Sequence, residues 1–299
     1  MSGAEPAFRC SRASLDSGDD LAGSASTVRA FLLVEAEGAW GAQALGARLL
    51  PEAVRTMLRE LERRHHVRPL LIRRAGRRAG DDATVTAFAA HAGPDDPWLE
   101  RTRLDRLEDL VDLDLAAVGE GRRPGLTPYD GPLFLVCTHG RHDACCAERG
   151  RPVWLAMRHA EPERTWQVSH IGGDRFAANV VVLPDGLYYG RMTALDAPRL
   201  AEAHRTGRLL LEHLRGRTAY PFAVQAAEVF LRRATDLLGA GDLRLLETRR
   251  DGPVTTAVFV AGERRWEVRV HTSHAEARQL TCSADRPNRP LRHELLSLS

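Results

Sequence analysis

Three of the five cysteines gather in one short stretch of the chain, as Cys137, Cys145 and Cys146. Cys137 ends the apolar run LFLVC, and Cys146 follows after eight residues, at the expected start of a helix. The positive end of a helix lowers the pKa of a nearby thiol and so favours the thiolate. His170 ends the next apolar stretch, and Asp174 comes four residues later, after two glycines. Sulfur donors with imidazole are typical of zinc, copper and iron–sulfur sites, so we expect metal or redox chemistry here.

The elements that must position these residues follow from periodicity and from turn signals. The pattern predicts, in order, a buried strand at 132–138, a helix at 146–160, a strand at 165–170, a hairpin at 176–192 and a long helix at 195–216. This is the order of a thioredoxin-like domain. Ligand sites in α/β sheets lie beyond the carboxyl ends of strands, and two such ends are expected to meet here.

A looser version of the same order is predicted over residues 30–118. Its elements are a strand that begins the stretch 31–40, a helix from Pro51, strands at 68–74 and 84–90, and a helix at 103–118. The two stretches share no clear residue pattern, so a duplication is only a hypothesis. The segment 121–132 is rich in glycine and proline and is expected to be a linker.

The remainder of the chain predicts a helix at 220–239, three strands within 243–272 and an extended tail at 282–299. We therefore expect an α/β protein in three parts. They are an N-terminal α/β half that could be thioredoxin-like (1–125), a thioredoxin-like domain with the metal site (126–216), and a C-terminal helix with a small antiparallel sheet (217–299).

Composition excludes several function classes. All 42 basic residues are arginines, and the missing lysine amine removes Walker-type phosphate loops and Schiff-base chemistry. A net charge of +2 gives no general attraction to nucleic acid or to a membrane. No apolar run is long enough to span a bilayer and no secretory signal is evident, so we expect a cytoplasmic protein. In that compartment clustered cysteines favour metal or redox chemistry over structural disulfides.

Two segments carry a family resemblance. CTHGRHDACCAERGRP and SHIGGDRFAANVVVLPDGLYYGRM resemble the sucrase/ferredoxin-like family, whose members include thioredoxin-like ferredoxins. Residues 10–41 and 220–232 resemble the family's opening segment and a later helix. The resemblance implies a 2Fe-2S iron–sulfur cluster held by two cysteines and two histidines. It implies an electron carrier rather than a stand-alone enzyme, and for such a carrier we expect a redox partner protein, with a flavin reductase as one candidate.

The family pattern is a cysteine, eight residues, a second cysteine and then His-x-Gly-Gly-His. The ligands that match it are Cys137, Cys146 and His170. Asp174 occupies the position of the second histidine. Three interpretations stay open: Asp174 ligates through oxygen, Cys145 or Cys282 supplies a thiol instead, or the fourth ligand is missing and the cluster is labile or not formed.

Three further residues are expected around the site. His139 lies within the ligand loop and is a ligand, a proton relay, or a loop histidine that is solvated or bound to backbone; the same interpretations apply to its neighbour His142. Arg141 and Arg175 flank the ligands; they stabilise the negative charge of the cluster, dock a redox partner, or are placed there by chance, since arginine is abundant. Cys10 and Cys282, near the two ends of the chain, are most simply free thiols.

Two alternative functions remain open. The same ligands would satisfy tetrahedral zinc, which would give a zinc-binding protein, or the chain could be a metal-free structural or binding protein. A thiol-redox protein could instead use Cys145 or Cys146, although the usual Cys-x-x-Cys spacing is missing.

Overall fold

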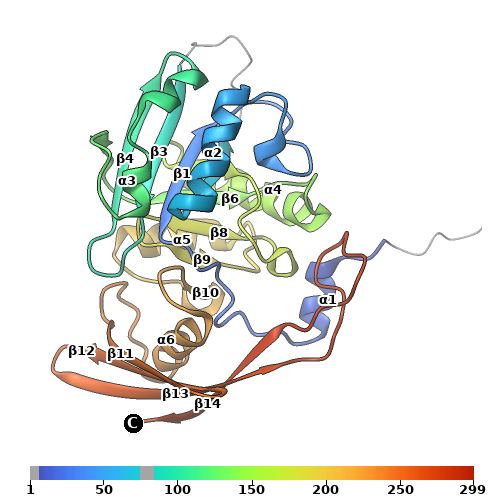
Figure 1. Ribbon diagram of the computed structural model, residues 1–299. Coiled ribbons are helices and arrows are strands. Elements are labelled where there is room, and N and C mark those ends of the chain that lie inside the picture. Colours follow the sequence, from blue (N-terminus) through green and yellow to red (C-terminus); the bar gives the residue numbers. More distant parts are fainter. Residues whose placement is uncertain (1–6, 75–83) are drawn as a thin grey trace, which may run out of the picture.

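The computed structural model describes residues 7–74 and 84–299, which form a mixed α/β fold with two sheets (Figure 1). The predicted fold class is confirmed. A large mixed sheet has the strand order β10-β9-β8-β6-β7-β2-β1-β3-β4-β5, and a smaller antiparallel sheet has the order β11-β12-β13-β14. Among the residues described, no helix combines the length and the apolar character that crossing a membrane requires.

The strands of the large sheet are β1 (Ala30–Glu35), β2 (Val67–Arg73), β3 (Val85–His91), β4 (Trp98–Leu104), β5 (Thr127–Pro128), β6 (Leu133–Cys137), β7 (Thr165–Val168), β8 (Val180–Leu183), β9 (Leu187–Tyr189) and β10 (Leu214–Arg217). Those of the small sheet are β11 (Arg244–Asp251), β12 (Val254–Ala261), β13 (Arg264–His274) and β14 (Leu291–Leu298). The α-helices are α1 (Cys10–Asp16), α2 (Glu52–His65), α3 (Ala116–Gly119), α4 (Ala144–Ala160), α5 (Asp196–Arg205) and α6 (Phe222–Thr235). Short 3₁₀ helices are η1 (Ala44–Gly46), η2 (Leu107–Asp112), η3 (Asp174–Phe176) and η4 (Leu211–His213).

The large sheet consists of two similarly connected halves. The first half contains β1 to β4 with α2 between its parallel strands, in the spatial order β2-β1-β3-β4. The second half contains β6 to β9 with α4 between its parallel strands, in the corresponding order β7-β6-β8-β9. The halves join where β2 and β7 pair antiparallel through only two residue pairs, Ile72 with Val168 and Arg73 with Gln167.

Alternation along the strands builds a separate core on each side of this sheet. Leu32 and Val34 of β1 pack in the core that contains Leu58 of α2. Phe31 and Leu33, on the opposite face, share a second core with strands of both halves, including residues from β6, β7 and β8. Cys137 and Cys146 also belong to this shared core, so the site lies where the two halves meet.

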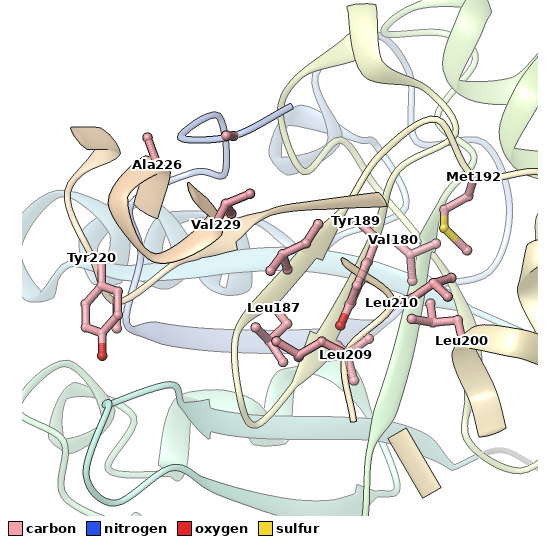
Figure 2. Close-up of a cluster of buried hydrophobic side chains, with 14 of the residues drawn as sticks. Val180, Leu187, Tyr189, Met192, Leu200, Leu209, Leu210, Tyr220, Ala226 and Val229 are labelled. Atoms are coloured by element: carbon pink, nitrogen blue, oxygen red, sulfur yellow. The ribbon is translucent and has the colours of Figure 1, made fainter. Parts of the chain in front are cut away.

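The second half buries its other face under α4, α5 and α6. Figure 2 shows Leu187 and Tyr189 of β9 close to Leu200 of α5 and Val229 of α6. α6 lies between the large sheet and the small C-terminal sheet (Figure 1), whose Phe259 belongs to the same core. The predicted helix and antiparallel segment after residue 216 are thus present.

The helix predicted at 103–118 is wrong. Residues 98–104 form β4, paired antiparallel with β3, and only the short η2 and α3 follow. Val111, which would lie on the apolar face of that helix, has 45% of its surface exposed. Only residues 103 and 104 of the predicted helix belong to β4, and Leu110, Leu115 and Val118 reach the core of the first half from η2, α3 and the turn between them. Packing against this core outweighs the helical spacing of the leucines.

Three other boundaries differ from the prediction. The helix expected to reach residue 216 ends at Arg205, because Gly207 adopts a left-handed φ of 68° and the chain then continues to β10. The tail expected at 282–299 contains β14, which pairs with β13. The helix expected from residue 146 begins two residues earlier and continues through Pro152 without a break.

The connection between β13 and β14, residues 275–290, extends away from the small sheet and meets α1 (Figure 1). Cys282 in this connection has its sulfur 3.7 Å from the sulfur of Cys10 in α1. α1 and this connection therefore come together beside the start of α4.

Candidate metal centre

β6 and α4 position the two cysteines of the site. Cys137 ends β6 and is 1% exposed, while Cys146 lies in the first turn of α4. The carboxylate of Asp143 caps this helix by accepting a hydrogen bond from the backbone N–H of Cys145 at 2.8 Å. Gly150 lets α4 approach the end of β6, since a Cβ there would collide with the carbonyl oxygen of Cys137. The helix start and the strand end are thereby held against each other.

A turn after β7 brings His170 and Asp174 to the same place. Gly172 and Gly173 have φ values of 97° and 83°, which favour glycine, and they return the chain toward α4. His170 Nδ1 lies 2.9 Å from Asp174 Oδ1, and the Cys146 thiol donates a hydrogen bond to the same oxygen at 3.1 Å. We call Cys137, Cys146, His170 and Asp174 the Cys–His–Asp site.

The four side chains shift one another's pKa values, so that Cys137, His170 and Asp174 favour their charged forms and Cys146 favours its neutral thiol. Hydrogen bonds from Cys146 and His170 outweigh burial and hold the pKa of Cys137 well below its usual value, which favours the thiolate. The hydrogen bond to Cys137 and burial raise the pKa of Cys146. Burial opposes the charging of His170, yet Asp174 and Cys137 raise its pKa to about 9. Burial would raise the pKa of Asp174, but His170 lowers it below its usual value.

The residues fit a metal that prefers sulfur and imidazole donors. The sulfurs of Cys137 and Cys146 and a ring nitrogen of His170 all lie within 4.8 Å of one another. His170 Nδ1 is buried, and although it is close to Asp174 it makes no hydrogen bond of acceptable geometry. A buried imidazole nitrogen that faces a carboxylate, with two cysteine sulfurs close to the same ring, is an arrangement that a cation would satisfy.

The structure shows two further residues, His142 and Arg215, beside the Cys–His–Asp site. The ring of His142 stacks on that of His170 with centroids 3.7 Å apart, and its Nε2 lies 3.8 Å from Asp174 Oδ2. Arg215 is buried, and its guanidinium donates to the Gly172 carbonyl oxygen at 3.0 Å. Its charge also acts on Asp174 and Cys137. The position of His142 inside the ligand loop was a sequence signal for it, whereas Arg215 is one of many arginines and had none.

The three residues expected around the site have different surroundings. His139 Nε2 donates to the Gly41 carbonyl oxygen at 2.7 Å, and its Nδ1 accepts from the backbone N–H of His170 at 3.2 Å. Arg141 is exposed beside a pocket of about 440 Å³ that His139 also lines. Arg175 forms an ion pair with Asp19 at 3.3 Å.

The two thiols considered as substitute ligands lie in a second group. Cys145 Sγ is 3.4 Å from Cys282 Sγ, and Cys282 Sγ is 3.7 Å from Cys10 Sγ. Asp143 completes the group, with both carboxylate oxygens 3.7 Å from Cys10 Sγ. We call these four residues the three-cysteine cluster. Cys10 and Cys282 are free of disulfides, but they are not isolated thiols.

Comparison with known proteins gives one match. The family model described as sucrase/ferredoxin-like matches residues 21–216, which is more than half of the chain and includes the whole Cys–His–Asp site. Comparisons with curated proteins and with solved structures find no match. The chain belongs to the sucrase/ferredoxin-like family.

Proposed function

We propose that this protein is an electron carrier whose Cys–His–Asp site holds a 2Fe-2S cluster. The observation that supports this most directly is the distribution of donor atoms. They form two overlapping sets, one of Cys137, Cys146 and His170 and the other of His142, His170 and Asp174. Each set lies within 4.8 Å, and His170 belongs to both. Donors spread over two adjoining sets suit a centre with two metal ions better than one tetrahedral ion.

The chain's own residues would set the properties of this centre. When bound, the cluster supplies one-electron redox chemistry. Two thiolates, one imidazole and one carboxylate carry more negative charge than the two thiolates and two imidazoles of a Rieske centre, so Asp174 favours a lower potential. The buried Arg215 opposes this effect, because its charge acts on Asp174 and Cys137 from inside the protein.

The exposed edge of the site suggests where a partner binds. Cys137 and Cys146 are each 1% exposed, whereas the side chains of His170 and His142 are 23% and 35% exposed. We therefore expect a redox partner protein, with a flavin reductase as the candidate class, to dock against the histidine edge.

The first half of the sheet contributes a cover for the ligand loop. The loop after β1 provides the Gly41 carbonyl oxygen that binds His139 and the Ala42 carbonyl oxygen 3.3 Å from His142 Nδ1. The ring edge of Trp40 contacts His139 with centroids 5.7 Å apart. We infer that this loop restricts solvent at the site and holds the imidazoles in place.

Anaerobic purification tests the proposal. We expect brown protein with about two irons and two acid-labile sulfides per chain, and a rhombic electron paramagnetic resonance signal after reduction. The Cys137→Ser variant should lose both iron and sulfide, whereas the matched control Cys282→Ser should keep them. Colourless protein with zinc that is lost in Cys137→Ser would overturn the proposal in favour of a zinc site. Metal-free protein with rapidly reacting thiols would indicate a thiol-redox protein instead.

Zinc is the second candidate because of the donor set itself. Two cysteines, a histidine and a carboxylate are all common zinc ligands. The three donors of Cys137, Cys146 and His170 also lie within 4.8 Å of one another, a spacing that one ion accommodates. Iron, sulfide and zinc analysis of the anaerobically purified protein distinguishes the two candidates.

A further inference from the structure

The three-cysteine cluster brings together side chains from three distant parts of the chain. Cys10 comes from α1, Cys145 and its neighbour Asp143 from the start of α4, and Cys282 from the connection between β13 and β14. Cys10 and Cys145 are each 1% exposed, and Cys282 is half-buried. All four donor atoms lie within 4.8 Å of one another.

The spacing of the sulfurs suits one tetrahedral ion. Zinc–sulfur bonds of about 2.3 Å place the sulfurs of a tetrahedral site about 3.8 Å apart. The separations here are 3.4 Å between Cys145 and Cys282 and 3.7 Å between Cys282 and Cys10. A disulfide requires about 2.05 Å, and it would leave the third thiol without a partner.

Asp143 offers a fourth donor. Its Oδ1 accepts from the backbone N–H of Cys145 at 2.8 Å, and its Oδ2 accepts from that of Cys282 at 2.7 Å. A carboxylate has about four acceptor positions, so both oxygens retain lone pairs. The two hydrogen bonds fix the carboxylate beside the sulfurs, as an outer shell of hydrogen bonds does for metal ligands.

Burial raises the pKa of Cys10 and of Cys282 while no metal is bound, but several neighbouring groups would stabilise thiolates on a bound cation. Ser11 donates a hydrogen bond to Cys145 Sγ at 3.2 Å, and Cys145 lies in the first turn of α4, near the positive end of the helix. Arg9 interacts electrostatically with Cys145 and Cys282, and Arg175 does so with Cys10. Arg175, which we expected beside the Cys–His–Asp site, thus interacts with the three-cysteine cluster.

We propose that Cys10, Cys145, Cys282 and Asp143 form a second metal site that binds a single zinc ion. Zinc is the ion of choice because three thiolates and a carboxylate in tetrahedral spacing match its structural sites. The ion fastens α1 and the connection 275–290 to the start of α4, which also supplies Cys146 of the other site. The site is structural, and it does not depend on whether the Cys–His–Asp site holds iron.

Metal analysis of the full-length protein tests this proposal. Anaerobically purified protein, dialysed against zinc and then against buffer, should retain one zinc that Cys10→Ser and Cys282→Ser lose. These variants should keep the iron and sulfide of the wild type. The control Cys137→Ser should lose iron and sulfide but keep the zinc. If the Cys–His–Asp site itself binds zinc, the wild type should hold two zinc ions and each single variant one. Failure of the iron–sulfur proposal is therefore seen as a second zinc, and failure of the second-site proposal as zinc that Cys10→Ser and Cys282→Ser do not lose.

Cobalt provides a readout that does not depend on the folding of the cluster variants. Added to Cys137→Ser after a chelator has removed the zinc, Co²⁺ should give sulfur-to-metal absorption with an intensity typical of three thiolates and the visible bands of tetrahedral coordination. Limited proteolysis should cut residues 275–290 faster in Cys282→Ser, or after chelation, than in the zinc-loaded protein. Unchanged zinc content in both cluster variants, or a native disulfide among the three cysteines found by alkylation and mass spectrometry, would overturn the proposal.

Discussion

The two halves of the large sheet have the same strand order, yet among the residues that the structure describes only the second half contains a group of side chains that could hold a metal ion. β1 ends at Glu35 and leads into a loop with Trp40, whereas β6 ends at Cys137 and leads into the ligand loop. The loop of the first half contacts the ligand loop through Gly41 and His139. The loop after β6 thus contains ligand residues of the site, whereas the corresponding loop after β1 covers that loop.

The difference shows that the topology brings the strand ends and the helix start together, whereas the residues at those positions determine whether a metal can bind. Strand ends and a helix start converge in both halves, because the connection between parallel strands is similar. Only the second half has a cysteine at the strand end and another in the first helical turn. If the metal site belongs to the second half alone, changes in the core of the first half should leave metal binding intact.

The largest expected effect is the loss of the metal centre. In the proposed cluster Cys137 is a buried thiolate ligand, so Cys137→Ser should lower iron per chain by at least about tenfold. Elemental analysis with circular dichroism as a folding check measures this. Cys282→Ser is the control and should keep the iron of the wild type. Full iron retention in Cys137→Ser would show that the cluster is held elsewhere.

A core mutation in the first half should separate stability from metal binding. Leu58 of α2 is fully buried, so Leu58→Ala should lower the free energy of unfolding by about 2–5 kcal/mol. Iron per folded chain should not change. The control Leu155→Ala, on α4 with 59% of its surface exposed, should change stability by less than about 0.5 kcal/mol. Denaturant unfolding and iron analysis check both; a proportional loss of iron would show that the first half supports the ligands directly.

The second half should also make stability depend on pH through His204. Burial lowers the pKa of His204 to about 4, and its Nε2 lies 2.9 Å from the hydroxyl of Tyr189. The unfolded chain binds the proton more readily, so stability should fall as pH decreases from about 6.5 to about 4, by up to about 3 kcal/mol. His204→Gln should flatten the profile in this interval. An identical pH profile for both proteins would contradict the assignment.

The smallest effect is expected on the redox potential. Asp174→His replaces an anionic ligand by a neutral one, so the potential should rise by about 100 mV, or roughly 2 kcal/mol for one electron. The wild type should lie between plant-type ferredoxins and Rieske centres. Redox titration measures both values. A wild-type potential already in the Rieske range, with no rise in the variant, would exclude Asp174 as a ligand.

Much of the second half could be predicted from local pattern. Buried strands, the hairpin turn and the helix after the ligand loop all have short-range signals, and β6, β7, β8 and β9 lie where these signals indicated. The segment 103–118 could not be predicted in this way. Its leucines fit helical spacing, but the segment forms the end of β4 followed by η2 and α3, because pairing with β3 and packing in the core of the first half override that spacing.

The sequence by itself determined which donor types stand at the strand ends and at the helix start, because these depend on residue identity and short spacing. It placed Cys137, Cys146, His170 and Asp174 in one neighbourhood, and the structure brings them together. Only the tertiary structure decided that His142 and Arg215 adjoin them and that Cys145 points instead to Cys10 and Cys282. The contacts of Cys282 with Cys145 and Cys10 join positions more than a hundred residues apart, and those of His142 and Arg215 join separate loops and strands, so no local pattern encodes the packing that aligns them.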